Sequence, residues 1–180
     1  MKRLYSGGMN AIFERRSVRS FLSKAVEKDK IERVVKAAFE APSAHNRRSW
    51  EFLVVTAKED LAAIGSMSPY AKMCPGAAAA IVPCANLGAG KDPASERPDA
   101  WWVQDLAAAT ENILVQITCE GLGGVWLGWY PDMDRVAALS LRFGLPSHIT
   151  PFSVVALGYP AAPAVLKDRY DPSKVHYGVW

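Results

Sequence analysis

Arginine side chains are concentrated near the start of the chain, where Arg15, Arg16 and Arg19 flank the hydroxyl group of Ser17. A guanidinium group presents a planar fork of donors that matches the oxygens of a phosphate. This loop could therefore hold a phosphomonoester through several charge-assisted hydrogen bonds. The same residues could instead form a solvated basic loop that complements the dipole of a preceding helix. The segment alone leaves both interpretations open.

A second polar segment follows a helical pattern and consists of Pro42, Ser43, Ala44, His45 and Asn46. A hydroxyl group, a carboxamide and the exposed amides of a turn could hydrogen-bond a planar heterocycle or a ribityl chain. The alternative is an ordinary helix end that proline terminates. Because no nucleophile stands near His45 in the sequence, we assign this histidine no catalytic role.

Two further segments could complete such a site. The run Gly123–Gly128 includes Leu127, and its glycines would let the backbone approach a flat ligand closely and donate to ring atoms. Near the C-terminus, Lys167 and Arg169 could bring two cations back to a phosphate. Taken separately, the first segment could be only a helix cap and a strand, and the second only a solvated tail.

The side chains alone offer little nucleophilic or metal chemistry. The sequence contains no GxSxG or HExxH motif and no P-loop, and its three histidines lie far apart. Cys74, Cys84 and Cys119 have no CxxC spacing, which argues against a zinc site or a disulfide framework. We therefore predict no catalytic side chain and no metal site, and we expect a bound cofactor to supply the reactivity.

The composition indicates a soluble protein built as one domain over residues 1–180. Half of the 180 residues are hydrophobic and the formal net charge is only +3, so a sizeable core can form without metals or disulfides. Acidic and basic residues alternate on predicted helix faces, which argues against nucleic acid as a partner. The sequence shows no secretory signal and no membrane-spanning run, and the odd cysteine count fits the reducing cytoplasm.

The hydrophobic pattern predicts the elements that position these residues. Helices are expected at Met9–Glu14, Val26–Glu40, Lys58–Ser66, Trp101–Glu120 and Asp132–Phe143. Strands are expected at Trp50–Thr56, Ala77–Cys84, Val125–Trp129 and Pro151–Leu157. We expect Pro83 to end the strand Ala77–Cys84, and Gly121–Gly124 to end the helix Trp101–Glu120. The first arginine cluster then lies between two helices, and the Pro42 segment joins a helix to a strand.

The irregular alternation of helices and hydrophobic strands predicts an α+β fold, a three-layer α/β/α sandwich around a mixed sheet. A Rossmann dinucleotide fold is disfavoured, because the G-x-G at Gly121–Gly123 follows its helix instead of opening it. Residues Leu87–Asp99 lack periodicity and predict a loop that is mobile or contacts a partner.

Taken in order, four segments resemble the nitroreductase family of FMN-dependent flavoproteins over nearly the whole chain. The resemblance is carried by Arg15–Phe21, Ala41–Phe52, Gly121–Gly128, and Gly158–Pro160 followed by Lys167–Tyr170. It implies a mainly antiparallel sheet and an interlocked homodimer with an FMN at each of two interface sites. The family commonly has Gln-Pro before the tryptophan, where this chain has Arg48 and Ser49. Because of that departure and the bulky His45, the resemblance does not define the substrate pocket.

The resemblance also implies a flavin site that is divided between the subunits. One subunit would hold the phosphate, the ribityl chain and the pyrimidine edge through Arg15, Arg16, Ser17, Arg19, Lys167 and Arg169. The other would contribute Pro42, Ser43, Ala44 and Asn46. The amides around Leu127 and Gly128 would face the flavin N5 side, and Arg19 would stabilise negative charge near N1 and O2.

The implied activity is that of an NAD(P)H-dependent oxidoreductase. NADH or NADPH would pass hydride to the flavin, and a nitroaromatic or quinone-like acceptor would then enter the same space in a ping-pong cycle. We expect acceptor contacts at Leu87–Asp99, Trp101 and Trp102, with core packing as an equal alternative for the tryptophans. Two other readings stay open: a dehalogenase or flavin-modifying enzyme on the same scaffold, and a non-enzymatic flavin- or nucleotide-binding dimer.

Overall fold

A five-stranded sheet forms the centre of the computed structural model, which describes residues 10–88 and 101–180. Its strands are β1 (Trp50–Val55), β2 (Ala79–Asn86), β3 (Gly123–Gly128), β4 (Ile149–Pro151) and β5 (Ser153–Gly158). They run in the order β1-β2-β5-β3, and β4 pairs with β2 beyond the end of β5. Each pairing between these five strands is antiparallel, and a parallel bridge joins Ser17 to Gly124 of β3. The sheet is therefore mainly antiparallel.

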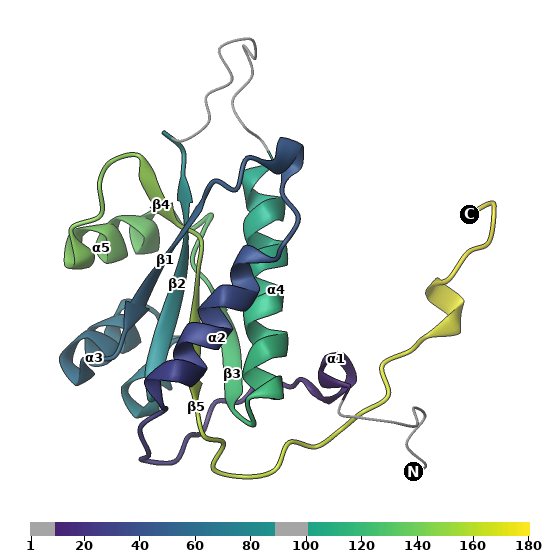
Figure 1. Cartoon of the computed structure of the whole chain (residues 1–180), viewed down its shortest axis with the longest axis horizontal. Coiled ribbons are helices and arrows are strands. Elements are labelled where there is room, and N and C mark those ends of the chain that lie inside the picture. The colour runs from purple at the N-terminus through teal and green to yellow at the C-terminus, as the bar shows by residue number, and fades with distance from the viewer. Residues whose placement is uncertain (1–9, 89–100) are drawn as a thin grey trace.

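Helices cover both faces of this sheet (Figure 1). One face carries α2 (Lys28–Phe39) and α4 (Trp102–Cys119), and the other carries α3 (Lys58–Met67) and α5 (Met133–Phe143). A separate buried hydrophobic cluster fills the space on each side. The short helix α1 (Ala11–Glu14) lies beside α4, and the chain after β5 extends away from the sheet (Figure 1). The predicted α+β fold, with helices on both faces of the sheet, is confirmed.

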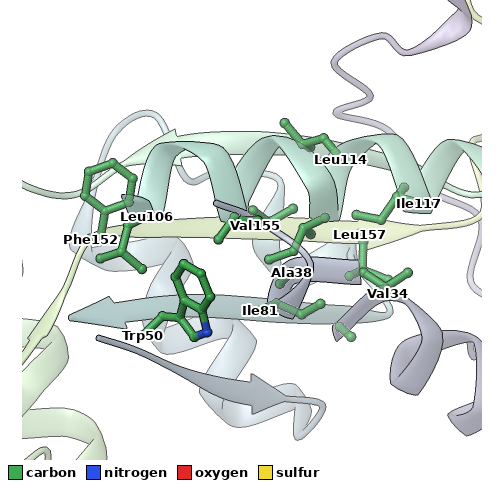
Figure 2. Packing of buried hydrophobic residues seen from close by; sticks show 14 of the residues in the cluster. Val34, Ala38, Trp50, Ile81, Leu106, Leu114, Ile117, Phe152, Val155 and Leu157 are labelled. Carbon is green, nitrogen blue, oxygen red and sulfur yellow. The ribbon is translucent and has the colours of Figure 1, made fainter. Parts of the chain in front are cut away.

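Helix α4 is fixed firmly against the sheet. Its side chains Leu106, Ile113 and Ile117 recur at helical spacing and are almost completely buried. These side chains belong to one buried cluster with Val155 and Leu157 of β5, and in Figure 2 Leu106 lies beside Phe152 while Ile117 lies over Leu157. Burying each such side chain contributes about 1.5–3 kcal/mol to stability. The helix therefore gives a rigid reference for any segment that is attached to it.

Helix α5 begins at Met133, one residue after the predicted start at Asp132, and ends at the predicted Phe143. The carboxylate of Asp132 accepts the N–H of Arg135 at 3.2 Å and so caps the first turn. At the other end Gly144 adopts φ 61°, the left-handed conformation that favours glycine.

The expectation that Pro83 ends its strand is wrong, because β2 continues to Asn86. Strand β2 pairs with β5 up to Ile81 and with β4 from Cys84. Pro83 lies where the ladder changes partner, so its missing N–H is not needed there. Its carbonyl still accepts the N–H of Phe152 at 2.9 Å. Phe152 also divides the predicted last strand into β4 and β5.

The expectation that Gly121–Gly124 ends α4 is confirmed for Gly121 alone. Gly121, with φ 70°, follows the helix, but Gly123 and Gly124 belong to β3. A Cβ atom on Gly123 would lie 2.6 Å from the side chain of Val18, and one on Gly124 would lie 2.9 Å from Ile117. These two glycines are therefore needed for close packing of the Val18 segment and of α4 against β3.

Candidate functional site

A cavity of roughly 530 Å³ opens at the end of β3, within the range of about 300–1,000 Å³ that is usual for small-molecule sites. Its lining includes Arg19, Tyr70, Trp126, Leu127, Gly128 and Arg135. Arg19 comes from the first predicted site segment, and Leu127 and Gly128 come from the third. The fold therefore brings parts of these two segments together.

Gly128 leaves open space at the cavity. A Cβ atom built on this residue would meet no other atom of the described chain within 4 Å. The direction of its N–H follows from that of Gly124, four residues earlier on β3. Gly124 accepts the N–H of Val18 on the side of the strand opposite β5. Strand residues alternate in direction, so the N–H of Gly128 points outward like that of Gly124. A flat ligand could lie against this edge and accept a hydrogen bond from Gly128.

Leu127 has the opposite orientation on the strand. Its side chain is 5% exposed and packs in the hydrophobic cluster between the sheet and α5. By the same alternation its N–H faces β5, and the N–H of Trp129 does donate to Phe152 on that side at 3.3 Å. Of the two predicted amides, that of Gly128 is therefore the one aimed away from the sheet.

The three arginines of the first cluster have three different environments. Arg15 forms an ion pair with Glu111 of α4 at 3.0 Å. Arg19 is exposed and lines the cavity. Arg16 donates through Nη1 to the carbonyls of Phe13 and Arg15 at 2.8 and 2.6 Å. Within one chain the three guanidinium groups therefore do not converge on a single phosphate position.

Arg16 also binds the C-terminal arm, which we define as residues 161–180. Its guanidinium group donates to the carbonyl of Lys167 at 3.0 Å and to that of Val165 at 3.3 Å. These contacts bring the predicted cation Lys167 beside the arginine cluster, 151 residues away in sequence. Arg169 follows it on the arm, and the whole arm is exposed in the chain. The arm thus returns to the first segment through contacts of its backbone carbonyl groups with Arg16.

The turn that carries Pro42, Ser43, Ala44 and Asn46 lies elsewhere in the chain. The N–H of Ala44 donates to the carboxylate of Asp105, in the first turn of α4, at 3.0 Å. Ser17, in contrast, pairs with Gly124, which lies beyond the other end of that helix. An 18-residue helix is about 27 Å long. Figure 1 likewise shows this turn and α1 toward opposite ends of α4, so one chain does not bring both segments to the same place.

The structure decides between the two readings of Trp102. This side chain is only 9% exposed, and its ring lies 4.7 Å from that of Tyr130 and 6.1 Å from that of Phe152. Core packing is therefore the correct alternative for Trp102, whereas Trp101 is exposed. Most of the predicted loop at Leu87–Asp99 lies outside the described residues.

Sequence reasoning missed three residues near these segments. Tyr70 and Arg135 reach the cavity from separate parts of the chain, and Arg135 lies 5.6 Å from the centre of the Tyr70 ring. No pattern in the sequence indicated that meeting. Asp105 is different, because it is an acidic residue within a nearly apolar helical stretch. That contrast is a sequence signal for a buried polar residue with a specific role.

The two buried cysteines, Cys74 and Cys84, are not activated as nucleophiles. Burial raises the pKa of Cys74 to about 11, and burial together with the charge of Glu51 raises that of Cys84 to about 12. Both therefore stay protonated at neutral pH. Among the described residues no group of histidine, cysteine and acidic side chains could hold a metal ion. Within the same residues no helix is long and apolar enough to cross a membrane.

Comparison with known proteins agrees with the predicted family and fold. A sequence model of the nitroreductase family matches residues 12–73 and 66–159. A protein of Archaeoglobus fulgidus named "Putative NADH dehydrogenase/NAD(P)H nitroreductase" is 42% identical over 176 residues, which cover 96% of this chain and 98% of that protein.

Solved structures give the same result. A crystal structure from Bacteroides thetaiotaomicron, with the same name, has a TM-score of 0.87 at 38% identity and covers 94% of this chain and 96% of that one. An FMN-dependent nitroreductase from Clostridium difficile has a TM-score of 0.83 at 26% identity, with 94% and 98% covered. Sequence, fold and segment order lead to one conclusion: the chain belongs to the nitroreductase family.

Proposed function

We propose that this protein is an FMN-dependent oxidoreductase that uses NADH or NADPH to reduce nitroaromatic or quinone-like acceptors. The observation that carries the proposal is the cavity in which the Arg19 cation faces the open edge of β3 at Gly128. Relatives named NAD(P)H nitroreductase and FMN-dependent nitroreductase support it. Bound FMN would supply the redox chemistry by storing an electron pair between two ping-pong half-reactions.

The residues around the cavity fit a flat, electron-accepting ring. The guanidinium group of Arg19 would stabilise negative charge on the pyrimidine edge, and the N–H of Gly128 would donate to the opposite side of the ring. Trp126 would contribute an aromatic wall. No side-chain nucleophile is needed for this chemistry, in keeping with the protonated state of Cys74 and Cys84.

We further propose that the site is completed in an interlocked homodimer. The arm exposes large apolar side chains at Val165, Leu166, Tyr170, Tyr177 and Trp180. A run of this kind is unusual on a monomer and indicates a protein interface. A second copy would cover the arm and bring its own turn at Pro42, Ser43, Ala44 and Asn46 to the cavity.

In this arrangement the remaining predicted residues would hold the phosphate end of the cofactor. The set consists of Arg15, Ser17, Lys167 and Arg169, with Arg16 fixing the backbone of Lys167. The whole chain, residues 1–180, would serve as one FMN-binding domain. Its location in the cytoplasm stays a prediction.

The visible spectrum of freshly purified protein tests the proposed function. We expect a flavin spectrum that NADH or NADPH bleaches without oxygen, and that a quinone or nitroaromatic compound then restores. A colourless protein that takes up no FMN from solution would contradict the proposal. A protein that binds FMN but is not reduced by either nicotinamide would support the binding-dimer alternative instead.

Arg19→Ala should weaken FMN binding and slow its reduction by NAD(P)H. A hydrogen bond to a charged group contributes about 1.5–3 kcal/mol, which corresponds to about a tenfold to hundredfold change in Kd. Fluorescence titration with FMN and stopped-flow absorbance measure the two effects. Lys36→Ala, which removes an exposed cation from α2, serves as the control for charge. Unchanged affinity and rate in Arg19→Ala would eliminate this role.

A further inference from the structure

Asp105 is a buried acidic residue at an uncommon position. Its side chain is 6% exposed, and its neighbours in the first turns of α4 include the buried Trp102, Leu106 and Ala109. A carboxylate in such surroundings is costly unless hydrogen bonds and nearby positive charge compensate for the lost water. The N-terminus of α4 supplies part of that compensation through its dipole. The N–H of Ala44 supplies a hydrogen bond at 3.0 Å.

The turn that Asp105 holds has a demanding backbone conformation. His45, Asn46 and Arg48 have φ values of 54°, 54° and 51°. These values lie in the left-handed region, which residues other than glycine rarely adopt. Within the turn, the Oγ atom of Ser43 accepts the N–H of Arg48 at 3.1 Å, and Oδ1 of Asn46 accepts Nε of Arg48 at 2.8 Å. These bonds shape the turn, and the bond from Ala44 to Asp105 fastens it to α4.

The same helix also holds the other half of the proposed site. Glu111, six residues after Asp105, forms the ion pair with Arg15. Helix α4 is anchored in the core by Leu106, Ile113 and Ile117. It can therefore set the positions of the turn and of the arginine cluster relative to one another.

We infer that Asp105 is a positioning residue for flavin binding, and that it acts on the site of the other subunit. Its carboxylate fixes the turn that includes Ser43, Ala44 and Asn46, and in the dimer this turn faces the FMN held by the partner's arginine cluster. The inference rests on the proposed function. It adds a residue that lies outside the cavity and acts through a backbone amide.

Two substitutions separate positioning from general stability. Asp105→Asn keeps an oxygen acceptor for the N–H of Ala44, whereas Asp105→Ala removes it. We expect the alanine variant to weaken FMN binding by about tenfold or more, and the asparagine variant to stay within about threefold of the wild type. Fluorescence titration gives Kd, and the visible circular dichroism of bound flavin reports its surroundings. Asp134→Ala, which removes an exposed carboxylate from the first turn of α5, is the control for loss of an acidic group near a helix N-terminus.

The outcomes of this comparison are distinct. A purely structural role would lower the melting temperature of Asp105→Ala while Kd, measured well below that temperature, stayed unchanged. That result would overturn the inference, and so would an equal loss of affinity in the alanine and asparagine variants. If wild-type protein bound no FMN, the proposed function itself would fail. If Arg19→Ala weakened binding and Asp105→Ala did not, only the inference would fail.

Mixed dimers test whether Asp105 acts across the subunit boundary. A dimer of one Asp105→Ala chain and one Arg19→Ala chain has both defects in one site and neither in the other. We expect it to bind FMN at half the wild-type stoichiometry with wild-type affinity, although each homodimeric variant binds weakly. If the turn served its own chain, each site would carry one defect and no tight site would appear. That outcome would overturn the inference.

Discussion

Removal of residues 161–180 is expected to yield a folded protein that neither dimerises nor retains FMN. The arm contributes nothing to the buried core, because all of its residues are exposed in the chain. Its loss would remove Lys167 and Arg169 together with the apolar side chains that we propose the partner subunit covers. Without these cations and the second turn, FMN should bind about a hundredfold more weakly or not at all. Sedimentation and FMN titration measure both effects.

A second variant separates the two contributions of the arm. Lys167→Ala/Arg169→Ala keeps the apolar side chains, so it should remain dimeric and lose only FMN affinity. A truncated protein that still dimerised would show that other surfaces form the interface. A truncated monomer that bound FMN tightly would contradict the divided site.

Most of the fold follows from local sequence signals. The long, nearly apolar run at Trp101–Glu120 predicts a helix, which the structure has at Trp102–Cys119, and the pattern over Asp132–Phe143 predicts α5. The errors arose where pairing partners decide the outcome. Pro83 remains in a strand because β2 changes neighbour at that residue, and a single sequence does not show where that happens.

The candidate site was predictable in its chemistry but not in its contacts. Cations beside a glycine-rich strand indicated a site for an anionic, flat ligand, and Arg19 does meet Gly128 at the cavity. The pairing of Arg15 with Glu111, and of Arg16 with the carbonyl groups of the arm, depends on tertiary structure. A long, flexible side chain can reach several possible partners. Which partner it binds depends on how the folded backbone places them.

The glycines of β3 show how one residue type serves two physical purposes. At Gly123 a Cβ atom would collide with Val18 at 2.6 Å, so glycine is required by the packing of the chain itself. At Gly128 a Cβ atom would meet no described chain atom within 4 Å, although the residue lines the cavity. The chain itself therefore does not demand glycine there. If the proposed function is right, the demand comes from the bound cofactor.

Gly128→Val should consequently preserve folding and abolish tight binding of FMN. Valine suits a strand, and its side chain would occupy the space that we assign to the flavin ring. Overpacking costs about 1–3 kcal/mol, which corresponds to about a tenfold to hundredfold weaker Kd for FMN. Gly123→Ala should do the reverse, lowering the free energy of unfolding by about 1–3 kcal/mol while the folded fraction still binds FMN. Urea unfolding and FMN titration of both variants distinguish the cases, and tight FMN binding by Gly128→Val would place the flavin elsewhere.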